Sequence, residues 1–143
     1  MSSAAPSPTT APVTSGAHHI GLTVPSLTDA ADFFTKTLGF SIVGEKPDYP
    51  ALFVSDGVTM ITLWQATNGA DATPFDRKTN IGLHHIAFKV SGPDALSTLH
   101  TRLKTAKNVM IEFAPESLGG SKTNHMMCTI PGNIRVEFIA PAA

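Results

Sequence analysis

The chain repeats one short pattern, and this repeat limits its possible folds more than any other feature. The segment HHIGLTV at 18–24 returns as HHIAFKV at 84–90, 66 residues later, with four of seven positions identical. Each copy is followed by a segment with the apolar spacing of a helix and then by three short β-prone runs. A repeat of this kind indicates two copies of one structural unit, each made of a strand, a helix and three strands.

Each expected helix has its own start and stop signals. The first begins after Ser26 as N-cap and ends at Gly39, and the second opens with Gly-Pro-Asp at 92–94 and has Lys104 and Lys107 near its end. The β-prone runs are 40–46, 51–55 and 58–65 in the first copy, and 109–113, 122–130 and 134–140 in the second.

We therefore predict an α+β fold of two tandem βαβββ modules, whose curved half-barrel sheets surround a metal or ligand cavity. Module one spans 17–66, a linker 67–80 and module two 81–143, together forming a single domain over 17–143. Residues 1–16 consist almost wholly of Ala, Ser, Pro, Thr and Gly, which predicts a flexible tail without a functional role.

Composition excludes several classes of function. Only 15% of residues are charged, and 10 basic against 11 acidic residues leave a net charge of −1, which argues against nucleic-acid binding. No apolar run approaches the roughly 20 residues that span a bilayer, so we expect no membrane partner. The single cysteine, Cys128, cannot form an internal disulfide, so a cytoplasmic location is expected.

The charged residues at 76–78, in the linker between the two modules, are predicted to be a solvated surface cluster.

The alternation of side chains along the strands indicates which residues face the cavity. Neighbouring side chains of a strand point to opposite faces, so each His-His pair can send only one imidazole to the open face. His19 shares its phase with glycine and threonine, and His85 shares its phase with alanine and lysine, whereas the other phase is strongly apolar. The same test places Glu137 of the last strand on the open face.

Two imidazoles and one carboxylate are a plausible ligand set for a divalent ion with open positions, the 2-His-1-carboxylate arrangement. His19, His85 and Glu137 would suit Fe, Mn, Zn, Ni or Co, and the ion would bind substrate oxygens or act as a Lewis acid. The alternative is that the histidines are hydrogen-bonded structural residues and the glutamate is solvated. The recurrence of an inward histidine at the same point of both copies favours the metal site.

Several other side chains are candidates for contact with a substrate. Thr62 and Trp64 share the phase of the open face, and Trp64 would offer an aromatic surface with Phe53, although core packing explains Trp64 equally well. Lys122 and Asn124 lie in or next to a Gly-Gly-Ser loop that could close over a ligand or could be a plain hairpin loop. Arg135 could bind an anionic substrate or hold the carboxylate of Glu137.

At these residues the sequence resembles the vicinal oxygen chelate superfamily, which includes glyoxalase I, extradiol dioxygenases, fosfomycin resistance transferases and bleomycin-binding proteins. The segments that carry the resemblance are HHIGLTVPSLTDAADFFTKTLGF, GLHHIAFKV and IPGNIRVEFIAP, and the similarity covers about residues 17–141. It implies paired βαβββ modules, often completed by exchange of modules between two chains, so a homodimer is expected.

The resemblance also implies that the metal ligands come from the first and fourth strands of each module, at positions His19, Thr62, His85 and Glu137. Thr62 stands where glyoxalase I supplies a carboxylate that is both ligand and base. A threonine hydroxyl cannot replace that base, which argues against glyoxalase I activity. Three ligands are more similar to the extradiol dioxygenases and the fosfomycin transferases. The only tyrosine, Tyr49, lies on a turn, so His125 is the candidate acid or base.

Two functions follow as hypotheses. The first is a metal-dependent enzyme, dioxygenase-like or glyoxalase-like, acting on a small organic substrate that chelates the ion through its oxygens. The second is a metal-free binding protein of the bleomycin-resistance type that sequesters an aromatic small molecule against Trp64 and Phe53.

Overall fold

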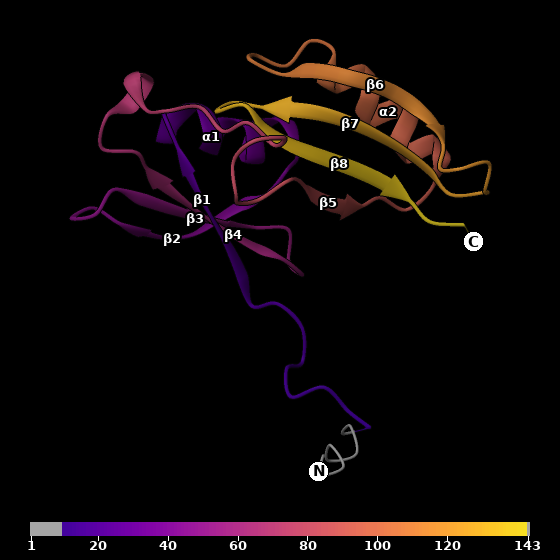
Figure 1. The fold of residues 1–143 in the computed structure, drawn as a ribbon, viewed down its shortest axis with the longest axis horizontal. Helices are drawn as coiled ribbons and strands as arrows, with labels where there is room; N and C mark the ends of the chain where they lie inside the picture. Colours follow the sequence, from indigo (N-terminus) through magenta and orange to yellow (C-terminus); the bar gives the residue numbers. More distant parts are fainter. Residues whose placement is uncertain (1–9, 143) are drawn as a thin grey trace, which may run out of the picture.

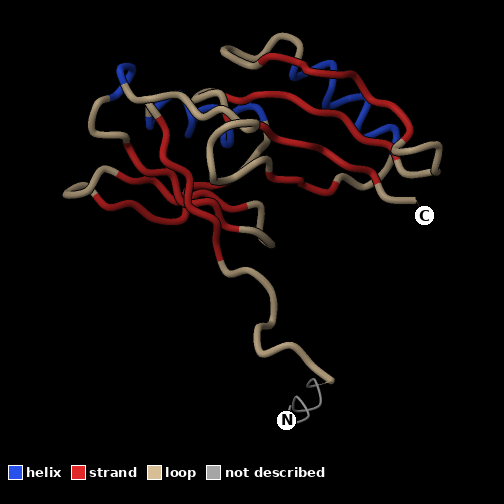
Figure 2. Tube along the Cα trace, viewed as in Figure 1, coloured by secondary structure: helices blue, strands red, loops and turns tan. Residues whose placement is uncertain are grey.

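The computed structural model describes residues 10–142 and contains two four-stranded sheets, each with one helical segment against one face (Figure 1). The first sheet has the order β1-β4-β3-β2 and the second the order β5-β8-β7-β6. Figure 2 shows the same arrangement, with strands in red, helices in blue and a long tan connection between the two sheets. The predicted α+β fold of two tandem modules is confirmed.

The elements of the first half are β1 His19–Val24, α1 Leu27–Asp32, η1 Phe33–Thr37, β2 Ser41–Lys46, β3 Ala51–Ser55 and β4 Met60–Gln65. The connection carries one short 3-10 helix, η2 Gly69–Asp71. The elements of the second half are β5 Ile86–Lys89, α2 Pro93–Leu103, β6 Met110–Ser117, β7 Asn124–Ile130 and β8 Ile134–Ala140. Of the predicted N-terminal tail, residues 1–9 lie outside the described residues.

In each half the first strand pairs in parallel with the fourth, while the other neighbours are antiparallel. Gly21 lies opposite Thr62 in the first sheet, and Ala87 lies opposite Glu137 in the second. This pairing places the first and last strands of each repeat side by side at one edge of its sheet.

The helix signals of the first module are only partly followed. Ser26 is the N-cap, and its hydroxyl accepts a hydrogen bond from the Asp29 amide at 3.2 Å. Gly39, with φ of 80°, ends the segment. Between them the last turn widens into a π-helix, which the sequence did not predict. This widening turns both Phe33 and Phe34 into the core, where they are 3% and 0% exposed.

The burial pattern confirms the predicted strand phases. Leu22 and Val24 are buried, whereas Gly21 and Thr23, which alternate with them, are exposed. The second sheet has the same alternation, with Val136 and Phe138 buried. The buried phases face the helices, so the opposite, open face of each sheet is left to carry the polar residues.

The two modules share one core. The Phe34, Phe40 and Phe88 rings, from the first and second halves of the chain, meet edge to face at centroid distances of 5.2 to 6.4 Å. Burying a phenylalanine stabilises a fold by about 1.5–3 kcal/mol, so this cluster ties the two sheets into one unit. Among the described residues, no helix is long and apolar enough to cross a membrane.

The reactivity of the Cys128 thiol tests how tightly this core is packed. It lies in β7 with 0% exposure, and burial raises the pKa of its thiol to about 12. Since the thiolate is the reactive form, we expect no reaction with a thiol reagent in the native protein at pH 8 and complete reaction in denaturant. Rapid labelling of the native protein would contradict this packing.

Candidate active site on the open face of the second sheet

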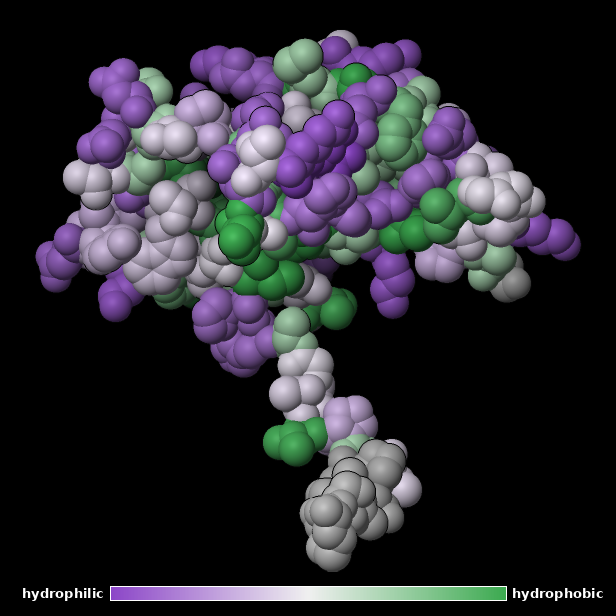
Figure 3. Space-filling view, in the orientation of Figure 1, coloured by the Kyte–Doolittle hydropathy of each residue, from purple (hydrophilic) through white to green (hydrophobic). Residues whose placement is uncertain are grey.

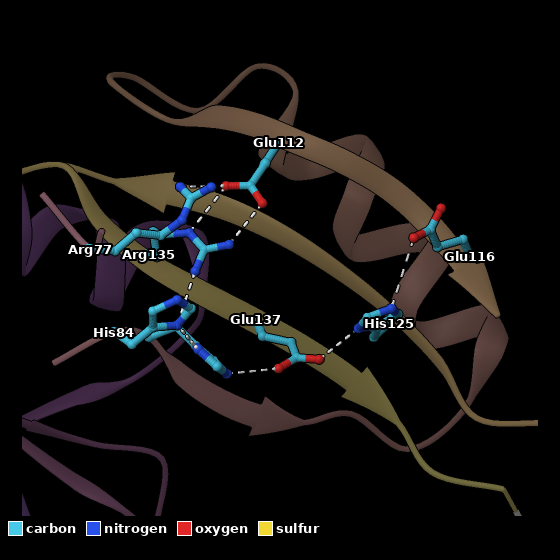
Figure 4. A network of polar contacts seen from close by, with 8 residues as sticks. Arg77, His84, Glu112, Glu116, His125, Arg135 and Glu137 are labelled. Carbon is cyan, nitrogen blue, oxygen red and sulfur yellow. Dashed lines mark hydrogen bonds and ion pairs between the residues drawn. The ribbon is translucent and has the colours of Figure 1, made fainter. Parts of the chain in front are cut away.

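Eight polar side chains form one continuous line of contacts across the second module, mostly over the open face of its sheet (Figure 4). In order along this line they are Arg77, Glu112, Arg135, His84, His85, Glu137, His125 and Glu116. We call this set the polar network. It draws on the connection, β6, β7 and β8, so residues up to 60 positions apart in sequence act on one surface.

Glu137 is the centre of the network. One carboxylate oxygen lies 3.2 Å from His85 Nε2, and the other lies 2.6 Å from His125 Nδ1. The Glu137 and His125 side chains are only 12% and 13% exposed. The two residues share a face because β7 and β8 are antiparallel, with Met127 opposite Glu137 and His125 two residues away.

This arrangement suits a carboxylate that must keep one orientation. The imidazole of His125 can donate a proton from Nδ1 to Glu137, while His85 presents Nε2 toward the same carboxylate. Glu116, at 4.0 Å from His125 Nε2, reaches the other side of that ring and is largely exposed. The structure therefore brings together two of the three predicted metal ligands and the candidate acid or base.

His19 lies elsewhere. It begins β1 of the first sheet, is exposed, and has its ring in contact with His18, with 2.9 Å between the two Nδ1 atoms. Within the described residues of one chain, no group of three or more His, Cys, Asp or Glu is arranged to hold a metal ion. One chain alone therefore does not assemble the predicted set of His19, His85 and Glu137.

The open face of the first sheet carries a cluster of aromatic rings in place of the polar network. Thr62 is 3% exposed, and its hydroxyl accepts a hydrogen bond from the Trp64 indole at 2.9 Å. The Trp64 ring lies 5.9 Å from that of Phe53 and, edge to face, 5.0 Å from that of Tyr49. A Cβ at Gly44 would come within 2.9 Å of the Phe53 ring, so glycine leaves room for this ring over the neighbouring strand.

Sequence reasoning missed Tyr49 as part of this aromatic cluster. The sequence placed it correctly on a turn between β2 and β3, but gave no sign that the turn folds its ring back to Trp64.

Arg135 forms contacts other than the one expected from its spacing to Glu137. Its Nε and Nη2 donate to the two Glu112 oxygens at 3.1 and 2.8 Å, and its Nη1 lies 3.2 Å from His84 Nδ1. Arg77 reaches Glu112 as well, at 3.4 Å. Thus the carboxylate that Arg135 holds is Glu112, and Arg77 is not simply solvated surface.

The contacts of Arg135 and Arg77 shift the pKa values of Glu112 and His84. The hydrogen bond from Arg135 and the charges of Arg135 and Arg77 hold the pKa of the Glu112 carboxyl below its usual range, against the opposing effect of desolvation. Desolvation, followed by the positive charge of Arg135, lowers the pKa of His84. Glu112 lies next to bulges in β6, which no sequence pattern marked.

Lys122 and Asn124 have no described contact with the polar network. Lys122 is exposed in the loop before β7, and Asn124 lies opposite Ala140, in the phase of Met126 rather than that of His125. Their contact with a substrate stays a prediction.

The Glu112–Arg135 pair makes a measurable contribution to stability. Because its carboxyl is about one third exposed, we expect Glu112→Gln to lower the free energy of unfolding by about 1 kcal/mol at pH 7. Since the folded pKa of Glu112 is lowered, this contribution is fully present above the unfolded pKa of about 4.3 and is lost as pH falls from there through the lower folded pKa. Urea unfolding at pH 7 and at about pH 3 measures it, with Glu45→Gln on β2 as the control; equal effects of both variants would contradict the assignment.

Solved structures show the same fold. A glyoxylase/bleomycin resistance protein/dioxygenase domain from Frankia sp. EAN1pec has a TM-score of 0.75 at 24% identity, over 90% of this chain and 93% of that chain. The fosfomycin resistance protein FosX from Listeria monocytogenes has a TM-score of 0.70 at 17% identity, over 91% and 96%. A lactoylglutathione lyase from Agrobacterium tumefaciens has a TM-score of 0.68 at 19% identity, over 90% and 96%.

Comparison with curated proteins gives no match to this chain. A family model, in contrast, matches residues 16–138, which include both histidine pairs and Glu137. With the two-module fold and this match over most of its length, the chain belongs to the Glyoxalase/Bleomycin resistance protein/Dioxygenase superfamily.

Proposed function

We propose that the protein is a metal-dependent enzyme that acts on a small organic substrate bound through its oxygens to a divalent ion. The ligands in this proposal are His19, His85 and Glu137. The observation that carries it is the 3.2 Å approach of His85 Nε2 to Glu137 Oε1 on the open face of the second sheet.

The chemistry of this pair fits a metal ion. Two ligands bound at about 2.1 Å and at a right angle to each other lie about 3.0 Å apart, close to the observed separation. Nitrogen and carboxylate ligands suit Fe, Mn, Zn, Ni or Co, and the identity of the metal stays open. His125 holds the second oxygen of Glu137, and such outer contacts orient a ligand and tune its basicity.

The third ligand requires a second copy of the chain. His19 stands on β1 at the position that His85 has before β5, and both belong to open faces. If the first module of one chain covers the second module of another, His19 of one copy faces His85 and Glu137 of the other. Exposed apolar residues next to the second histidine pair, Ile81 and Leu83, suit such a cover. Figure 3 shows hydrophobic surface in the middle of the molecule, beside hydrophilic side chains.

When bound, the ion supplies Lewis-acid stabilisation of substrate oxyanions. The chain's own residues supply orientation and proton transfer. His125 is the candidate acid or base, because its imidazole holds or accepts a proton at Nδ1 beside Glu137 and is reached by Glu116 from outside. The Thr62 hydroxyl is engaged by the Trp64 indole and offers no base, so a reaction that needs a second carboxylate is disfavoured. We expect this enzyme in the cytoplasm.

Metal uptake by complementary variants tests both the ligands and the dimer. His19→Ala and Glu137→Ala should each bind no stoichiometric metal alone. After unfolding and refolding together, half of the dimers contain one of each chain and one intact site of two, so uptake should return to about one quarter of the wild-type value. Elemental analysis after titration with Mn, Fe, Ni or Zn measures it.

His100→Ala, on α2 away from the open faces, is the matched control and should bind metal as the wild type does. If the wild-type protein takes up no metal, the proposal is wrong. Full uptake by His19→Ala alone removes His19 from the ligand set.

A second function has its own observation in its favour. The Tyr49, Phe53 and Trp64 cluster forms an aromatic surface that could sequester an aromatic small molecule without a metal. In that case quenching of Trp64 fluorescence by catechol should be unchanged after treatment with a chelator. Tyr49→Ala should weaken the binding about five-fold, for the loss of about 1 kcal/mol of ring contact. Val58→Ala, at another exposed site, serves as control. Quenching that disappears with the metal would favour the enzyme instead.

A further inference from the structure

A cavity of about 430 Å³ lies beside the polar network, between the connection and the ends of β7 and β8. Its polar lining consists of Asp76, Arg77, Lys78, Thr129, Asn133 and Arg135. Thr129 lies opposite Arg135 in the β7–β8 ladder, so both face the same side as Glu137. The cavity therefore opens on the surface that carries the proposed metal site.

The charges around this cavity do not cancel. Three cations line it, and the carboxylates nearby are Asp76 and Glu112. Both carboxylates are already engaged: Asp76 Oδ1 accepts the Lys78 backbone amide at 2.8 Å, and Glu112 accepts from Arg135 and Arg77. One positive charge remains in excess, and an anion that enters meets it in a partly enclosed space.

Donors without a partner also line the cavity. Among the described contacts, none engages the Lys78 ammonium, the Thr129 hydroxyl or the side-chain amide of Asn133, and Arg77 uses only Nη1. Arg135 is different, because all three of its nitrogens have partners. Arg135 thus contributes charge, while Arg77, Lys78 and the two neutral donors are free to hydrogen-bond an oxyanion.

A purely structural role explains only part of this set. The Arg77–Glu112 contact fastens the connection to β6, and that suffices for Arg77. It does not account for Lys78, Thr129 and Asn133, which gather at the same cavity without joining that pair.

The distance to the proposed metal site is short. Arg135 and Glu137 are two residues apart on one face of β8, which corresponds to about 6–7 Å along the strand. Figure 4 shows Arg77, Arg135 and Glu112 grouped at one side of the network, with Glu137 and His125 farther along β8. A small molecule can reach from one group to the other.

We propose that this cavity binds an oxyanion group of the substrate, a carboxylate or a phosphate, through Arg77, Lys78, Thr129 and Asn133. The substrate is then an organic anion whose chelating oxygens lie at His85 and Glu137, several bonds away from its anionic group. This inference rests on the proposed function for its link to catalysis, but the anion site itself needs no metal.

Titration of the full-length protein with inorganic phosphate, and separately with acetate, tests the site. Backbone amide shifts of residues 76–78 and 133 are followed by NMR at constant ionic strength. We expect saturable binding by one or both anions. Lys78→Gln should weaken it about ten-fold, corresponding to about 1.4 kcal/mol for one charge-assisted hydrogen bond. The matched control is Lys104→Gln, an equal change of charge at the C-terminal end of α2, away from the open faces, which should leave the affinity unchanged.

Each outcome decides. Stronger binding of phosphate than of acetate indicates a phosphorylated substrate, and the reverse indicates a carboxylic acid; both support the site. Absence of saturation, or equal effects of Lys78→Gln and Lys104→Gln, overturns it. Binding that a chelator abolishes places the anion on the metal and also overturns it. Failure of the proposed function is separate, since it appears as missing metal uptake while the phosphate titration is unaffected.

Discussion

The parallel pairing of the first and fourth strands in each module is the constraint on which the candidate site depends. In the second module it sets Ala87 opposite Glu137, so His85, two residues earlier in the same phase, lies diagonally across from that carboxylate. The first module uses the same register and sets Gly21 opposite Thr62. Strand alternation decides which strand residues reach the open face, and the pairing decides which of them meet. The expectation that only one imidazole of each pair reaches this face is wrong for the second pair, because His84 and His85 precede β5 and both join the network.

The two modules use this common frame for different purposes. At the position where the second module has Glu137, the first has Thr62, whose hydroxyl holds the Trp64 indole instead of a charged partner. Glycines at positions 21 and 44 leave room above the sheet for the rings and the threonine. One open face therefore carries a cluster of aromatic rings, and the other is charged and hydrogen-bonded. A substrate enclosed between two such faces would have an apolar contact on one side and polar recognition on the other.

Features of the fold that depend on the periodicity of the sequence could be predicted correctly. The repeat predicted both sheets, and the apolar phase placed Leu22 and Phe138 in the core and Glu137 on the open face. Features that break periodicity were missed. β6 runs four residues beyond its predicted end, and its bulges bring Glu112 and Glu116 to the network. The return of Tyr49 to Trp64 and the π-turn before Leu38 likewise depend on tertiary contacts that no local pattern records. The proposed role of His19 as a metal ligand depends on a second chain, and the sequence of one chain does not show how two copies pack.

The polar network also makes its face suitable for closure. Arg135, Glu137 and His125 are each only about one eighth exposed in a single chain, and covering them further would be costly if any charge lacked a partner. Each has a hydrogen-bonding partner: Glu112 for Arg135, His85 and His125 for Glu137. Because these three side chains already contact polar partners along the sheet, another sheet face can approach without leaving any of them without a polar contact, and the exclusion of water would strengthen the contacts that remain. An open face built from unpaired ions would resist such an approach, so the continuity of the network is itself a condition for a site enclosed between two modules.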